Sequence, residues 1–340
     1  MQQLALELLQ YPRPIAWTIS EVNRAEGHRD QRDMLLAAYE EVIRYLVLIE
    51  TARYAEYWAS GRGEAEVDRA LAGLRRPSLG HYVAALRELD EFLSDAGDRY
   101  AIGTGTRHSA PMMCKLCEDG PGTSKRVKQV SLLQVMSRVT ELRNEEKGHG
   151  YTGQLHAEAT TTVLQPALQE LLERIPLLLA QPLVWVEHIE LVDEHNLIVT
   201  LLALMGTQRA QRIRREVREA GSLKKGFLYM WDGEAAPLTM TPFLHLERSL
   251  HDEEVYVLAG VDGEPVYRSR GSTGAARHPD HLMSQLEERA PFLLKPVESK
   301  TVSAVPNASR FYQSAVEVAL ADAGVSQAEA AQLERIRKDL

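Results

Sequence analysis

The feature of this sequence that most limits its fold is a change of hydrophobic period at Gln181-Pro182. Before this point apolar residues recur three or four positions apart, which is typical of amphipathic helices. After it, β-branched and apolar residues alternate or form short blocks, which is typical of strands. The sequence therefore predicts an α+β protein, with an antiparallel helical bundle over residues 1–180, a smaller β-rich domain over 181–292, and a linker with a short helical tail over 293–340.

The periodic stretches before Gln181 predict five helices, at 33–60, 64–74, 78–97, 131–147 and 157–180. In the last of these, Pro166 should kink the helix or restart it, because proline lacks the backbone N–H that an interior turn needs. Helices of this length, joined by short connections, predict an antiparallel bundle.

The second part of the chain predicts strands and hairpins. Residues 183–191 and 197–204 are strand-like and flank the turn-forming residues 193–196. Strands are also expected at 227–231, 255–259 and 266–268, and a helix at 279–289. Residues 291–306 read as a linker, followed by helices at 309–323 and 326–340. Because that tail is similar to helical modules that continue further, we expect the chain to be a fragment or to lack a downstream domain.

The helix expected at 131–147 leads into the stretch Leu142-Arg143-Asn144-Glu145-Glu146-Lys147-Gly148-His149-Gly150. It opens on a capping box formed by Ser131 and Gln134. Helical spacing places Arg143 in line with the buried apolar stripe, an unusual position for a permanent charge. We expect Gly148 to let the chain leave the helix, so that His149 turns back towards Arg143.

An arginine, a polar residue directly after it and a histidine near a helix end resemble the core motif of the HEPN superfamily. The resemblance covers residues 30–180 and includes one extra residue between arginine and histidine. It implies a helical bundle that forms a homodimer and cleaves RNA without a metal. In that case Arg143 and Asn144 would hold the scissile phosphate, and His149 would act on the 2′-hydroxyl and the leaving group. Such ribonucleases occur in bacterial defence and toxin systems.

A structural interpretation of the same residues stays open. A cation near a helix C-terminus is favoured by the helix dipole, and Gly-His-Gly is an ordinary helix stop. In this second interpretation the bundle is a non-catalytic interaction module of a signalling or defence protein, and the β-rich domain senses a ligand or a protein partner. The net charge of -9 and the pI of about 5.7 favour it, whereas the in-line Arg143 and the adjacent Asn144 favour RNA cleavage.

Two basic runs are candidates for binding RNA or another anion. The first precedes the motif helix and contributes Arg107, Lys125, Arg126 and Lys128. The second contributes Arg214 and Arg218, which a helix would place on one face. A solvated basic surface is the alternative for each run.

The remaining features indicate the cell compartment and whether a metal or cofactor is expected. The chain has 340 residues, of which 44% are hydrophobic and 26% charged, as in ordinary globular proteins. It has no apolar run of membrane-spanning length, so we expect a cytoplasmic protein without a membrane partner. Its two cysteines, Cys114 and Cys117, have the spacing of half a zinc site, but a second ligand pair is missing; we therefore expect a thiol pair in a loop, no metal and no cofactor.

Overall fold

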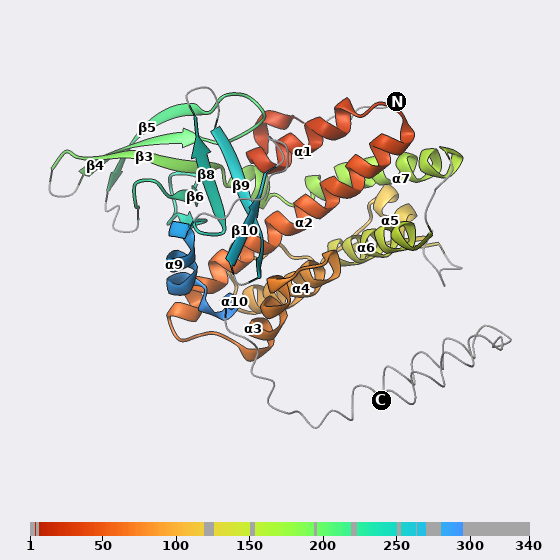
Figure 1. Cartoon of the computed structure of the whole chain (residues 1–340), viewed down its shortest axis with the longest axis horizontal. Coiled ribbons are helices and arrows are strands. Elements are labelled where there is room, and N and C mark those ends of the chain that lie inside the picture. Colours follow the sequence, from red (N-terminus) through yellow and green to blue (C-terminus); the bar gives the residue numbers. More distant parts are fainter. Residues whose placement is uncertain are drawn as a thin grey trace. The chain divides into compact units, whose positions relative to one another are not determined.

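The computed structural model describes residue 4 and residues 7–118, 126–149, 154–193, 196–218, 223–249, 253–262, 264–269 and 280–294. All of them belong to one compact unit, Met1–Lys295. Helices form most of its N-terminal half and antiparallel strands follow, so the expected α+β class with a helical N-terminus is confirmed (Figure 1). The expected tail lies outside the described residues, except for its first two positions.

The helices gather around α2, which contacts α1, α4, α6 and α7. Buried residues occur nearly all round α2, because neighbouring helices cover it on several sides. Pro166 lies inside α7, so the helix does not restart there. The described helical segments are η1 (Leu8–Gln10), α1 (Arg13–Arg24), α2 (His28–Ala59), α3 (Ala65–Ala72), η2 (Gly73–Arg75), α4 (Leu79–Asp95), α5 (Pro111–Glu118), α6 (Leu132–His149), α7 (Gln154–Glu173), α8 (Leu177–Ala180), α9 (Asp280–Arg289) and α10 (Pro291–Leu294).

The strands form three antiparallel sheets with the orders β5-β4-β3-β6-β7, β10-β9-β8 and β1-β2. Their bounds are β1 (Arg107–His108), β2 (Val130–Ser131), β3 (Leu183–Leu191), β4 (Asn196–Ala203), β5 (Gln211–Arg218), β6 (Leu228–Met230), β7 (Leu238–Thr239), β8 (Leu244–Arg248), β9 (Glu253–Asp262) and β10 (Glu264–Arg268). The hairpin expected around residues 193–196 is present as β3–β4, and the strands expected at 255–259 and 266–268 pair with each other as β9–β10. The basic run at 211–218 is a strand, so the helix considered for it is wrong.

One hydrophobic core runs through both halves of the described chain. It joins Ile15 and Tyr39 of the helices to Phe243 and Tyr256 of the β-rich part. The core therefore does not divide at Gln181, where the sequence predicts a domain boundary. A second, smaller cluster lies on the outer part of the five-stranded sheet and comprises Val184, Val186, Val199, Leu201, Leu223, Tyr229 and Trp231.

A buried arginine fastens the first helix to the strands. Arg13, only 3% exposed, donates from Nη1 to the carbonyl of Glu253 (2.8 Å) and from Nη2 to the carbonyl of Gln208 (2.6 Å). The carboxylate of Glu253 lies 3.7 Å from the same guanidinium. Because a buried guanidinium is stable only when its donors are satisfied, this contact fixes α1 against β9 and the segment before β5.

Buried carboxyl groups hold the connection between α4 and β1. Asp90 accepts from the backbone N–H groups of Gly103 (2.8 Å) and Thr104 (2.6 Å). The fully buried Glu50 of α2 accepts from the N–H of Ile102 (3.1 Å). Burial raises the pKa of Glu50 well above its usual value, and the neighbouring Asp90 raises it further.

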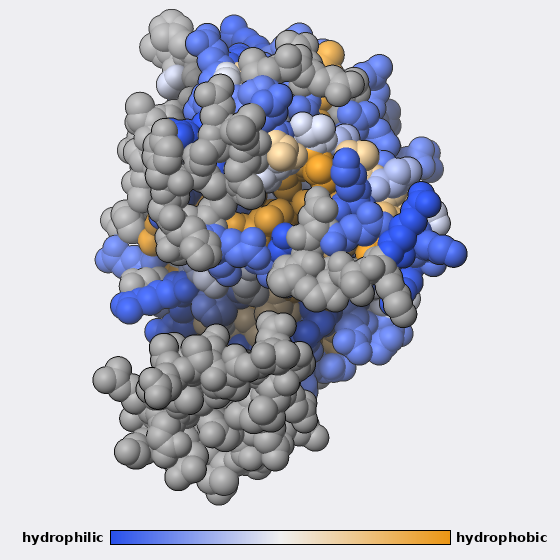
Figure 2. Space-filling model, turned by 90° about the vertical axis from the view of Figure 1, so that its right-hand side faces the viewer, coloured by the Kyte–Doolittle hydropathy of each residue, from blue (hydrophilic) through white to orange (hydrophobic). Residues whose placement is uncertain are grey.

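Among the described helices, none is both long enough and apolar enough to cross a membrane. Seen from the right-hand side of Figure 1, the described surface is mostly hydrophilic, with a strip of apolar side chains between the charged ones (Figure 2).

Candidate functional site

The motif helix begins as the sequence predicts. The backbone N–H of Ser131 donates to Oε1 of Gln134 (2.9 Å), and the N–H of Gln134 donates to Oγ of Ser131 (3.2 Å), which completes the capping box. Its apolar stripe is fully buried at Leu132, Val135, Met136 and Val139. The stripe sets the rotation of α6 and so decides which way Arg143 faces.

The far end of α6 differs from the expectation. The helix continues through Gly148 to His149, so the expected exit of the chain at Gly148 is wrong. Glycine inside a helix costs only about 1 kcal/mol, which the helix tolerates near its end. Six residues of continued helix separate the backbones of Arg143 and His149 by about 240° of turn. The side chain of His149 lies outside the described residues, so its approach to Arg143 stays a prediction.

Arg143 is bound to an acidic residue of α2. Its Nη2 lies 2.7 Å from Oε2 of Glu40, and the two side chains are only 24% and 18% exposed. Glu40 also binds Arg44 (2.8 Å), and Arg44 binds Glu41 (2.7 Å). Burial alone would lower the pKa of Arg44, but Glu41, Tyr82 and Glu40 raise it, so its net pKa lies above the ordinary value. These ion pairs join α6 to α2 across the bundle.

The charges around Arg143 are balanced by carboxylates. Arg138 of α6 lies 3.2 Å from both Glu141 and Glu145. The ion pairs described near the motif thus set three arginines (44, 138 and 143) against four glutamates (40, 41, 141 and 145). Asn144 is exposed at the surface of the helix. A phosphate at Arg143 would compete with Glu40 for the guanidinium and would be repelled by its carboxylate.

The first basic run lies at the other end of α6. Arg107 belongs to β1 and pairs with Ser131, directly before the first turn of the helix. From there to Arg143 the helix rises by about 16 Å. Arg126 and Lys128 are exposed on the segment that leads into β2, and Lys125 lies outside the described residues. In the described part of the chain, the backbone therefore does not bring this first basic run next to Arg143.

Arg214 and Arg218 lie on β5, the edge strand of the larger sheet. Because side chains alternate along a strand, both project from the same sheet face. Arg214 lies 3.4 Å from Glu190, in an ion pair that is more than half exposed on each side. Arg218 is exposed and has no ion pair with any described residue. The anion-binding role predicted for the two remains a proposal.

The two cysteines lie on α5 and not in a loop, so that expectation is wrong. Burial raises the pKa of Cys117 to about 11, with Cys114 as the next cause. Burial also raises the pKa of Cys114. Both thiols therefore stay protonated at neutral pH and are weak nucleophiles. Within the described ranges, no three His, Cys, Asp or Glu side chains are placed to hold a metal ion together.

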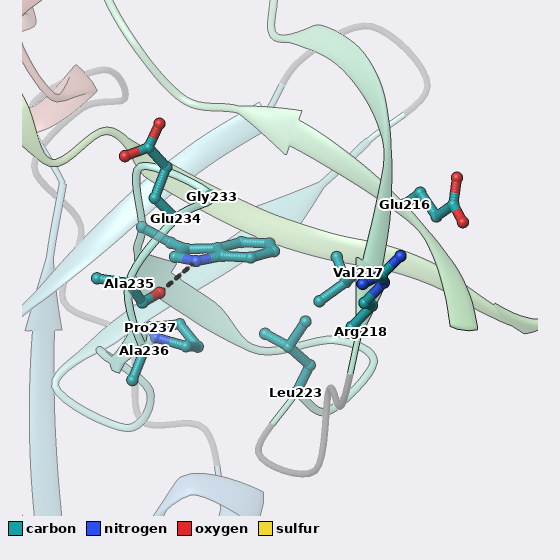
Figure 3. A pocket seen from close by; sticks show the side chains of 10 residues that line it. Glu216, Val217, Arg218, Leu223, Gly233, Glu234, Ala235, Ala236 and Pro237 are labelled. Carbon is teal, nitrogen blue, oxygen red and sulfur yellow. Dashed lines mark hydrogen bonds between the residues drawn. The ribbon is translucent and has the colours of Figure 1, made fainter. Parts of the chain in front are cut away.

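A hollow of about 380 Å³, which the sequence does not predict, lies at the end of β5. Val217 and Leu223 lie on one side, and Ala235, Ala236 and Pro237 on the other (Figure 3). The remaining lining residues are Glu216, Arg218, Trp231, Gly233 and Glu234. No local pattern predicts this hollow, because its walls come from β5, from Leu223 ahead of β6 and from the loop between β6 and β7.

Two contacts shape the loop that borders the hollow. The indole N–H of the buried Trp231 donates to the carbonyl of Ala235 (2.8 Å). Arg215 donates from Nη1 to the carbonyl of Asp232 (2.7 Å). Its guanidinium fills the space where a Cβ at Gly233 would lie, 1.3 Å away, and Gly233 has a φ of +92°. Only glycine fits this position, because it has no Cβ and adopts positive φ without strain.

In comparisons with known proteins, no family model, no curated protein and no solved structure matches the chain.

Proposed function

We propose that this chain is a non-catalytic interaction and sensor module of a signalling or defence protein, with a HEPN-like bundle and a β-rich part that receives the partner or ligand. The observation that carries the proposal is the 2.7 Å ion pair between Arg143 and Glu40. It supports a structural role for the motif arginine, because Glu40 also binds the buried Arg44.

The charge of the site supports this proposal. A ribonuclease of the expected kind needs an arginine that is free to hold phosphate, preferably through two parallel hydrogen bonds. Here the guanidinium is paired with a carboxylate and mostly buried, and the neighbouring ion pairs of Arg138 add no excess positive charge. Removing Arg143 would leave the mostly buried carboxylate of Glu40 with Arg44 but without its partner on α6, which weakens the link between α2 and α6.

A second candidate function is metal-independent RNA cleavage by a homodimer in a bacterial defence or toxin-type system. The exposed Asn144 and the quarter-exposed side chain of Arg143 favour it, because both are at the surface of α6. A conformational change that releases Glu40 would free Nη2 of Arg143 to bind RNA.

The test is incubation of the full chain with structured and unstructured RNA in EDTA, next to the His149→Ala and Arg143→Lys variants. We expect no cleavage above the level of a blank by any of the three proteins. We also expect Arg143→Ala to lower the free energy of unfolding by about 1 kcal/mol, since it removes a largely buried ion pair. Glu40→Gln is the matched variant, because it weakens the same pair from the other side.

Cleavage by the wild-type chain that is lost in His149→Ala would overturn the proposal in favour of the ribonuclease. The products would then carry a cyclic phosphate, because the 2′-hydroxyl attacks the adjacent phosphate in a metal-independent reaction. An unchanged unfolding free energy in both Arg143→Ala and Glu40→Gln would also count against the structural role of the motif arginine.

A further inference from the structure

The outer side of β5 is an open sheet edge. β5 pairs with β4 over all eight of its residues. Among the described residues, no backbone hydrogen bond and no strand pairing involves its other side. In Figure 1, β3, β4 and β5 extend away from the helices. An edge of this length offers a row of N–H and C=O groups to an added strand.

The hollow lies beside this edge, at the apolar face of the sheet. Val217 packs against the cluster that contains Trp231 and Leu223, and all three line the hollow. A strand added to β5 would run about 4.8 Å from it. A side chain of that strand next to Val217 would therefore enter the hollow and contact Trp231 and Leu223. The carboxylates of Glu216 and Glu234 point away from the centre of the hollow (Figure 3).

The opposite face of β5 is basic. Alternation places Arg212, Arg214, Glu216 and Arg218 on that face, and all four are exposed. Glu216 and Arg218, at the end of the strand, also border the hollow. Glu187 binds Arg212 through both of its oxygens, at 2.6 and 2.8 Å. Arg214 has only the long, exposed contact with Glu190, and Arg218 has no ion pair within the described residues. Acidic side chains on a neighbouring strand would therefore find two accessible cations.

We propose that β5 and the hollow bind an extended peptide segment of a partner protein by adding a strand to the sheet. The segment alternates acidic and apolar residues. Its acidic residues lie beside Arg214 and Arg218, and one apolar side chain, branched or aromatic, occupies the hollow against Trp231. The inference rests on the proposed interaction and sensor function and names the chemistry of the partner.

A second copy of this chain is a poorer occupant of the edge. β5 carries four arginines (212, 214, 215 and 218) and one glutamate (216). Two such strands side by side would repel each other, since like charges on adjacent strands destabilise a sheet. The same charges attract an acidic strand and so select between the two occupants.

The test is fluorescence anisotropy with the full chain and a labelled peptide of eight residues, the length of β5, in which glutamate alternates with leucine. We expect saturable binding by the wild-type chain. Ala236→Trp should abolish binding, because the exposed alanine lines the hollow and tryptophan would fill it. Arg218→Glu should weaken binding about tenfold, since it replaces an attraction with a repulsion.

Matched control variants test whether the loss of binding depends on the position of each substitution. Ala59→Trp and Arg69→Glu make the same changes at exposed helical positions away from the hollow, and they should leave binding unchanged. A peptide with lysine in place of glutamate should not bind. Circular dichroism and thermal unfolding would check that each variant is folded.

Three results would overturn the inference. They are absence of binding by the wild-type chain, equal binding of the acidic and lysine peptides, and full binding by Ala236→Trp. A concentration-dependent dimer that Arg218→Glu alters would assign the edge to a second copy instead. RNA cleavage by the motif would refute the proposed function while leaving the peptide result to stand alone. If the chain neither cleaves RNA nor binds the peptide, this inference is refuted and the proposed function is not.

Discussion

Replacing Glu50 by glutamine should make the protein more stable at neutral pH and should remove part of its pH dependence. Glu50 is fully buried and its pKa is raised, first by burial and then by Asp90. The folded chain therefore keeps the Glu50 proton at pH values where the unfolded chain has released it. The stability that the Glu50 proton contributes is fully present below the ordinary pKa of this group, near 4.5. It is lost as the pH rises towards the pKa of Glu50 in the folded chain.

The size of the effect follows from this linkage. Between the two pKa values of Glu50, each pH unit lowers the free energy of unfolding by about 1.4 kcal/mol. The wild-type chain therefore loses stability with each pH unit in this interval, whereas Glu50→Gln does not. Glutamine keeps an oxygen that can accept from the N–H of Ile102 and offers an N–H towards Asp90, but it does not titrate.

Urea unfolding, followed by far-UV circular dichroism at several pH values, would measure the difference between wild type and Glu50→Gln. We expect the two curves of stability against pH to diverge as the pH rises. Glu91→Gln, on the exposed face of α4, is the matched control and should run parallel to wild type. If the curve for Glu50→Gln also runs parallel to wild type, the prediction is wrong, because Glu50 then titrates alike in the folded and unfolded chains.

Three other substitutions test separate features. Gly233→Ala should lower the free energy of unfolding by about 1–2 kcal/mol in urea titrations, because it strains a positive φ and displaces Arg215. Ser131→Ala should cost about 1 kcal/mol by the same measurement, since it removes the cap of α6. Burial, and next His281, lower the pKa of His245 to about 4. His245→Leu should therefore reduce the loss of stability from about pH 6.5 down to pH 4, measured by acid titration of unfolding.

The parts of the fold that the sequence predicts well are those decided by near neighbours in the chain. The capping box of α6 needs only Ser131 and the residue three positions later. The β3–β4 hairpin follows from two apolar strands around a turn of polar residues. In both cases one short window holds all the interacting groups, so the pattern is sufficient.

The parts that the sequence does not predict depend on distant neighbours or on edges. Two prolines near Arg13 conceal the start of α1, although proline is well tolerated in the first turn of a helix. β5 looks helical because an edge strand carries charges where a central strand carries apolar residues. The contact of Arg143 with Glu40 joins two helices far apart in the chain, and the motif alone does not indicate it. The hollow at Trp231 likewise needs two separate segments to meet.

The buried Arg13 limits how this protein can move. It donates hydrogen bonds to the carbonyl groups of residues 208 and 253. In the sequence, the first of these precedes β5 and the second follows β8. If the strands swung away from the helices at Gln181, these bonds would break inside the core, and an uncompensated buried charge costs about 3–5 kcal/mol. Hinge opening at that point is therefore unfavourable. A force applied at the open edge of β5 would therefore move the sheet and the helical bundle together, as one rigid body.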